Sequence, residues 1–109
     1  MIAAILNVPK DAEDWARWTF NYQGEVQRIG AALRTNGIFV PQYQLDPLPP
    51  SDVDNWLSRV QQSHNDFNSA LGLQGSDLSS VEISDPRQLE AWAWLVYLEV
   101  STAQLALAI

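Results

Sequence analysis

The chain contains no cysteine, which excludes a disulfide framework and any metal site built on thiolates. It contains a single histidine, so a zinc site would have to rely on carboxylates, which suit zinc poorly. Acidic pairs such as Asp52 with Asp54 stand where first helical turns favour negative charge, and they lack the spacing of a calcium loop. The sequence therefore predicts no metal site and no dependence on redox state.

Basic residues are also scarce. Six Lys and Arg stand against thirteen Asp and Glu, which gives a formal charge of −7. The basic residues are scattered along the chain rather than clustered, and a surface of this charge repels phosphate backbones. We therefore expect no nucleic-acid partner.

No long hydrophobic run is present without interruption. The most apolar segment, residues 91 to 109, is broken by Glu99, Ser101, Thr102 and Gln104, and no basic flank follows it. The first residues, MIAAILNVPK, lack the basic leader and the length of a signal peptide. These features predict a buried helix rather than a membrane span, no membrane partner, and no export through a signal peptide.

What the chain does have is apolar and aromatic. It is 47% hydrophobic with five tryptophans in 109 residues, which is typical of one folded domain spanning residues 1–109. This aromatic content is large for a domain of this length. It indicates contacts beyond the chain's own core.

The last of three predicted helices covers residues 86–107. Asp85 can cap its first turn, Pro86 suits the first helical position, and Gln88 can reach back to complete the cap. Apolar residues follow in two stripes at helical spacing, so this helix needs cover on two sides. It is the element around which the rest of the chain should pack.

The first predicted helix covers residues 12–35. Asp11 is its expected N-cap, with Asp14 three residues later, and Asn36-Gly37 supplies the left-handed conformation that ends many helices. One apolar face runs along its whole length.

The second predicted helix covers residues 52–71. Ser51 followed by Asp54 is a capping pattern, and Gly72 ends the segment. Together the three segments predict an all-α fold, a small three-helix bundle.

The remaining segments connect these helices. Residues 1–9 are predicted to be extended, and residues 38–50, with four of the six prolines, form an extended strap between helices one and two. A strap of this length leaves open at which end of the first helix the second begins. Residues 71–84 are predicted to be an ordered loop with a short helical turn at 77–80.

The apolar pattern also predicts which residues form the core and which face a partner. The core should contain Trp18, Tyr22, Ile29, Trp56, Val60, Phe67, Leu89, Trp92 and Val96. The candidates for an interface are Phe39, Tyr43, Leu45, Trp94, Leu105, Leu107 and Ile109.

Three polar residues fall on faces that should be buried. Glu99 lies in the middle of the apolar helix, where a carboxylate must be paired or hydrogen-bonded. Arg28, Arg59 and His64 are candidate partners of Glu99. The favoured partner is His64, on the apolar face of the second helix, or Asn68 one turn later, because their face should meet the middle of the last helix. An alternative is a catalytic His64, but no serine or threonine is spaced so as to suggest a nucleophile beside it.

A pattern of spacings extends from residue 51 to residue 109. It comprises Trp56-Leu57, Gln62, His64, Asn68, Leu71-Gly72-Leu73, Ser76-Asp77-Leu78, Val81, Asp85-Pro86, Leu89, Trp92 and Glu99. This pattern resembles a set of small, mostly uncharacterised proteins encoded among the virion structural genes of tailed bacteriophages. The resemblance implies a structural part of a phage particle, a capsid or tail accessory, located in the virion after assembly in the host cytoplasm.

The sequence therefore favours a non-enzymatic protein that acts by assembly with other phage structural proteins and with copies of itself. It predicts no cofactor and no small-molecule substrate. A soluble helical adaptor or inhibitor that binds one partner protein is the first alternative. An enzyme that uses His64 is the second.

Overall fold

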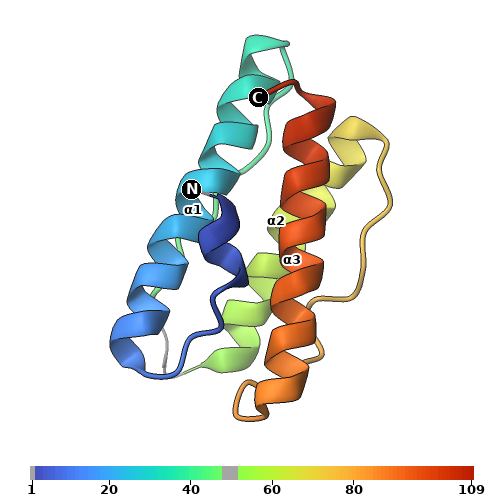
Figure 1. Ribbon diagram of the computed structural model, residues 1–109. Coiled ribbons are helices and arrows are strands. Elements are labelled where there is room, and N and C mark those ends of the chain that lie inside the picture. Colours follow the sequence, from blue (N-terminus) through green and yellow to red (C-terminus); the bar gives the residue numbers. More distant parts are fainter. Residues whose placement is uncertain (1, 48–51) are drawn as a thin grey trace.

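The computed structural model describes residues 2–47 and 52–109 (Figure 1). A short 3-10 helix, η1 (Ile2–Leu6), is followed by three α-helices: α1 (Ala12–Thr35), α2 (Val53–Leu71) and α3 (Pro86–Ala106). No strand occurs in these two ranges. The predicted all-α three-helix bundle is confirmed.

The three α-helices all run in the same direction. In Figure 1 each begins at the bottom of the view and ends at the top, so the chain has to return the full length of the bundle twice. The extended strap makes the first return and the loop between α2 and α3 makes the second. The sequence left this topology open, and the structure resolves it as parallel.

The helix ends follow the predicted capping chemistry. The carboxylate of Asp11 accepts a hydrogen bond from the N–H of Asp14 at 2.8 Å, and Asp85 accepts one from the N–H of Arg87 at 3.0 Å. Gly37 and Gly72 adopt φ values of +79° and +68°, the left-handed region that favours glycine. Gln88 reaches back to the cap as predicted, by donating from its side-chain amide to the Asp85 carboxylate, and its amide oxygen also accepts from the N–H of Glu82.

Two helix boundaries differ by one residue from those predicted. Asp52 caps α2 by accepting a hydrogen bond from the N–H of Asn55 at 3.0 Å, so the helix begins at Val53. Ser51, the predicted cap, lies outside the described residues. α3 ends at Ala106, with Leu107 as its C-cap.

Two predictions about the connecting segments were wrong. Residues 2–6 form η1 rather than an extended lead, because Ile5 becomes fully buried when this apolar segment packs against α1 and α3. Residues 77–80 form no helical turn. The carboxylate of Asp77 instead accepts from the N–H and hydroxyl of Ser79 and from the hydroxyl of Ser80, which is a local alternative to helical hydrogen bonding.

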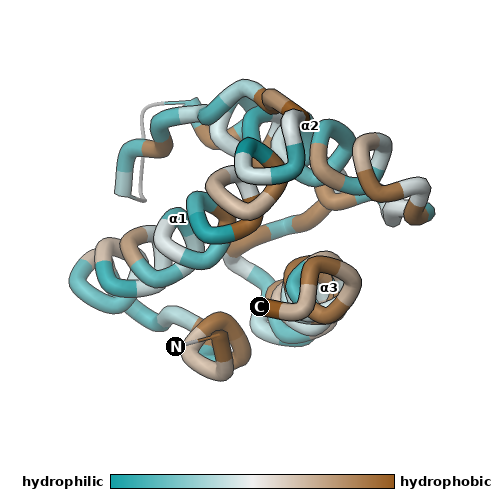
Figure 2. Tube along the Cα trace, turned by 90° about the horizontal axis from the view of Figure 1, so that it is seen from above, coloured by the Kyte–Doolittle hydropathy of each residue, from teal (hydrophilic) through white to brown (hydrophobic). Residues whose placement is uncertain are grey.

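All nine residues predicted for the core are buried. Viewed from above, the helices enclose one interior, with η1 beside α3 on the side of α1 (Figure 2). One indole from each helix meets there: Trp18 lies 5.3 Å from Trp92 and 6.0 Å from Trp56, measured between ring centroids. Aromatic pairs at these distances stabilise a core beyond the area that they bury.

The same three tryptophans hold the three segments that are not α-helical. The indole N–H of Trp18 donates to the carbonyl of Ile5 in η1 at 2.9 Å. Trp56 donates to Asp46 in the strap at 2.8 Å, and Trp92 donates to Leu78 in the α2–α3 loop at 2.7 Å. Each helix therefore fixes a different connecting segment to the core.

The described part of the strap packs on the bundle. Leu45 is buried, and the hydroxyl of Tyr43 donates to Asp66 of α2 at 3.0 Å. The side chain of Gln42 lies over Gly30 of α1, where a Cβ atom would collide with it. Gly30, which lowers helix propensity, thus makes room for the strap.

Candidate functional sites

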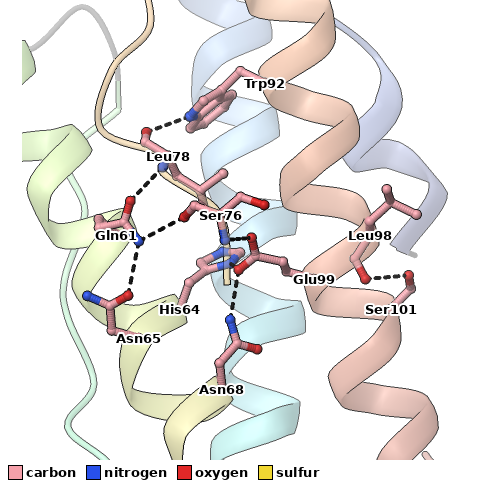
Figure 3. Close-up of polar contacts among 10 residues, drawn as sticks. All are labelled: Gln61, His64, Asn65, Asn68, Ser76, Leu78, Trp92, Leu98, Glu99 and Ser101. Carbon is pink, nitrogen blue, oxygen red and sulfur yellow. Dashed lines mark hydrogen bonds and ion pairs between the residues drawn. The ribbon is translucent and has the colours of Figure 1, made fainter. Parts of the chain in front are cut away.

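A buried polar centre joins α2, α3 and the loop between them. Glu99 Oε1 lies 3.0 Å from His64 Nδ1 and accepts a hydrogen bond from the amide of Asn68 at 2.8 Å (Figure 3). Glu99 Oε2 accepts a third hydrogen bond from the backbone N–H of Ser76 at 2.8 Å. The predicted pairing of Glu99 with His64 and Asn68 is confirmed.

The local sequence explains this geometry. His64 and Asn68 are four residues apart and so lie on one face of α2, opposite the middle of α3. Gly75 lets the loop approach them, because a Cβ atom there would lie 2.9 Å from Asn68 Nδ2 and 3.3 Å from Glu99 Oε1. Gln61 holds the loop from α2 by donating to the carbonyl of Ser76 and accepting from the N–H of Leu78. Neither Ser76 nor Gly75 was predicted, because a contact between a loop and a helix leaves no periodic signal.

Both ionisable members of the centre have shifted pKa values. Burial lowers the pKa of His64, and this effect outweighs the hydrogen bond and the charge of Glu99, which act in the opposite direction. Burial alone would raise the pKa of Glu99, but hydrogen bonds from His64, Ser76 and Asn68 bring it below its ordinary value. With Glu99 ionised, its carboxylate only accepts, so Nδ1 carries the proton of a neutral His64.

These shifts predict that acid destabilises the fold. The ordinary pKa of histidine is 6.5, and the pKa of His64 in the folded chain is lower. Below pH 6.5 the unfolded chain therefore binds more protons than the folded chain, and protonation favours unfolding. The stabilisation is complete above pH 6.5 and is lost as the pH falls toward the lower pKa of the folded state. Glu99 adds a loss in the same direction below its ordinary value of 4.5. Urea unfolding measured between pH 7 and 5.5 should give a free energy of unfolding that decreases as the pH decreases.

The matched control is His64→Gln, which can still donate to Glu99 but does not titrate. Its free energy of unfolding should change less between pH 7 and 5.5 than that of the wild type, since His64 is the only histidine. An unchanged pH profile in this variant would assign the dependence to other groups.

Within the polar centre the imidazole of His64 is closed to solvent. His64 is 0% exposed, and its ring lies between those of Tyr22, at a centroid distance of 5.8 Å, and Phe67, at 4.7 Å. A general base must come within hydrogen-bonding reach of the proton that it removes, and no substrate from solvent reaches this imidazole in the structure. The arrangement is suited to joining α2, α3 and the loop.

A second buried polar contact was missed in the sequence. Glu25 of α1 is buried, and its carboxylate accepts a hydrogen bond from Gln104 of α3 at 2.6 Å and pairs with Arg28 at 3.1 Å. Burial alone would raise the pKa of Glu25, but the Gln104 hydrogen bond and the Arg28 charge contribute to lowering it. Glu25 stands between Tyr22 and Ile29 on the apolar face of α1, and that position was the signal that could have revealed it.

The interface candidates divide into three groups. Phe39, Trp94, Leu105 and Ile109 are exposed. Tyr43 and Leu107 are partly buried, and Leu107 packs against the core. Leu45 is buried in the chain's own core and is not available to a partner, which corrects its assignment. Phe20, Ile38 and Leu98 are exposed apolar residues that were not among the candidates.

Four of the exposed residues of α3 form what we call the α3 face: Ala91, Trp94, Leu98 and Leu105. Their spacings of three, four and seven residues return to the same side of a helix. Trp94 is 50% exposed and Leu105 is 81% exposed. From Ala91 to Ile109 the only charged side chain is that of the buried Glu99.

A groove borders one end of the α3 face. It has a volume of about 510 Å³ and is lined by Leu6, Arg87, Glu90, Ala91 and Trp94. Ala91, the smallest of these side chains, leaves room between Trp94 and η1.

Residues 2–47 and 52–109 contain no group of three or more His, Asp or Glu side chains arranged to hold a metal ion. None of the helices in these ranges combines the length and the hydropathy needed to span a bilayer.

No family model, no curated protein and no solved structure matches this chain.

Proposed function

We propose that this chain is a non-enzymatic structural protein that acts by assembly with other proteins through the α3 face. The observation that carries the proposal is an uncharged apolar surface on a chain whose formal charge is −7. Exposed apolar area of this kind is characteristic of protein interaction sites, and interface energy concentrates in a few aromatic and aliphatic anchors. Trp94, Leu98 and Leu105 are such anchors.

The assignment to a particle rests on the resemblance between residues 51–109 and the virion structural proteins of tailed bacteriophages. It makes the chain a capsid or tail accessory protein, located in the virion. Its partners are then other phage structural proteins and further copies of the chain. The buried His64 and its contacts with Glu99 have a structural role in this proposal, not a catalytic one.

The test is incorporation into particles. A tagged chain is produced in cells that assemble the particle, and purified particles are analysed for the chain at fixed stoichiometry. Leu105→Glu should reduce incorporation by more than about tenfold, because placing a charge in a buried apolar contact costs more than about 1.4 kcal/mol. Circular dichroism of the variant should match that of the wild type, since Leu105 is largely exposed.

Phe20→Glu is the matched control. Phe20 is 78% exposed on α1, outside the α3 face, so its replacement should leave incorporation unchanged. Absence of the wild-type chain from particles would overturn the assignment to a virion. A soluble one-to-one complex with a single other protein would then support the adaptor alternative.

A further inference from the structure

We propose that the α3 face binds the same face of a second copy of this chain, with the two α3 helices antiparallel and a two-fold axis near Leu98. This inference deepens the proposed function, since it rests on assembly through the α3 face and names the first partner.

The α3 face carries a projection and a groove at equal distances from Leu98. Leu105 projects seven residues after Leu98, and Ala91, in the groove of about 510 Å³, lies seven residues before it. At 1.5 Å per residue each lies about 10 Å from Leu98 along the helix. A two-fold axis at Leu98 therefore brings Leu105 of each copy to the groove of the other, which is the self-complementarity that a symmetric dimer requires.

The residues on this side of α3 also have the spacing of a coiled-coil seam. Arg87, Ala91, Trp94, Leu98, Ser101 and Leu105 recur at alternating intervals of four and three residues. Figure 3 shows Leu98 and Ser101 on the side of α3 that turns away from Glu99 and α2. The seam is thus distinct from the stripe that packs on the chain's own core.

The charges favour a second copy in the antiparallel orientation. Two copies with a formal charge of −7 each repel, and the four residues of the α3 face carry no charge, while the groove at its end is lined by one cation, Arg87, and one carboxylate, Glu90. Arg87 stands in the first turn of α3 and takes part in none of the ion pairs of the described residues, while the last turn of α3 contains no basic residue. Antiparallel packing brings Arg87 near the carbonyl end of the partner's α3, where a cation is favourable. Because α1, α2 and α3 are parallel, an antiparallel neighbour also opposes their aligned dipoles.

The first experiment measures association of the purified protein by sedimentation equilibrium. The wild type should be a dimer, and both Leu98→Glu and Leu98→Lys should weaken self-association by more than about tenfold, because like charges then meet at the axis. An equimolar mixture of the two variants should recover the dimer, since opposite charges face each other. Phe20→Glu is the control and should remain dimeric. A monomeric wild type, or Leu98 variants that associate as the wild type does, would overturn the proposal.

The second experiment fixes the orientation and does not depend on charged variants folding. The chain has no cysteine, so Leu98→Cys introduces a single thiol, and oxidation should give a covalent dimer. Leu105→Cys alone should give none, but Leu105→Cys mixed with Ala91→Cys should give a mixed dimer. Self-crosslinking of Leu105→Cys would indicate parallel helices and would overturn the antiparallel arrangement.

The two proposals fail in different ways. Dimers formed by a chain that does not enter particles would leave this inference standing and contradict the proposed function. A chain that is monomeric in isolation but enters particles, and whose incorporation is reduced by Leu105→Glu, would contradict this inference and leave the proposed function standing.

Discussion

Replacement of Trp92 by alanine is expected to lower the free energy of unfolding by about 3–5 kcal/mol, the usual range for a large aromatic deleted from a core. The Trp92 indole is 4% exposed and lies 5.3 Å from Trp18 and 6.0 Å from Trp56, between ring centroids. Its loss leaves a cavity where the three helices meet and removes the hydrogen bond to the Leu78 carbonyl. Urea unfolding followed by far-ultraviolet circular dichroism measures the change.

Trp94→Ala is the matched control for this prediction. Trp94 is the same residue type on the same helix, two positions away, but it is half exposed. Its replacement removes a stacked contact with Tyr97 at 5.6 Å between ring centroids and should lower the free energy of unfolding by about 1 kcal/mol, well below the loss at Trp92. Equal losses in the two variants would contradict the assignment of Trp92 to the core and Trp94 to the α3 face.

Glu99→Ala should have an effect of similar size, about 3–5 kcal/mol, because each buried donor that is left without its acceptor costs about 1–3 kcal/mol. The carboxylate accepts hydrogen bonds from three groups, on His64, Asn68 and the Ser76 backbone. The donors on His64 and Asn68 would lose their acceptor in a buried environment, and the loop would lose a point of attachment at Ser76. Chemical denaturation gives the stability, and amide hydrogen exchange at Ser76 reports on the loop.

Glu90→Ala provides the comparison, because Glu90 is an exposed carboxylate on the same helix. Its removal should change stability by only about 0.5 kcal/mol and should leave exchange at Ser76 unaltered. If Glu99→Ala were as mild, the polar centre would not join the loop to the helices.

Local chemistry explains why so much of the fold could be predicted. Asp11, Asp85, Gly37 and Gly72 act within one turn of their own positions, so caps and helix ends are visible in a short stretch of sequence. The contact of Glu99 with His64 was also predictable, because a carboxylate on an apolar face has to be paired or hydrogen-bonded, and few polar side chains lie on the faces that meet it.

What the sequence did not reveal depends on contacts between distant segments. The burial of Ile5 requires the space between α1 and α3, and the burial of Leu45 requires the path of the strap. The Ser76 N–H reaches Glu99 only because Gly75 has no Cβ. None of these contacts produces a periodic pattern in the sequence, so hydrophobic periodicity does not predict them.

The three indole hydrogen bonds link the mobility of the connecting segments to the formation of the core. Trp18, Trp56 and Trp92 each place a ring among the other helices and an N–H on a segment outside them. When one segment detaches locally, a buried indole N–H is left without its acceptor, which costs free energy. Global unfolding exposes all three indole N–H groups to water together. Phenylalanine at any one of these positions would keep most of the ring contact and free a single segment. The chain thus has three separate points at which loop order can be uncoupled from helix packing, one for each connection.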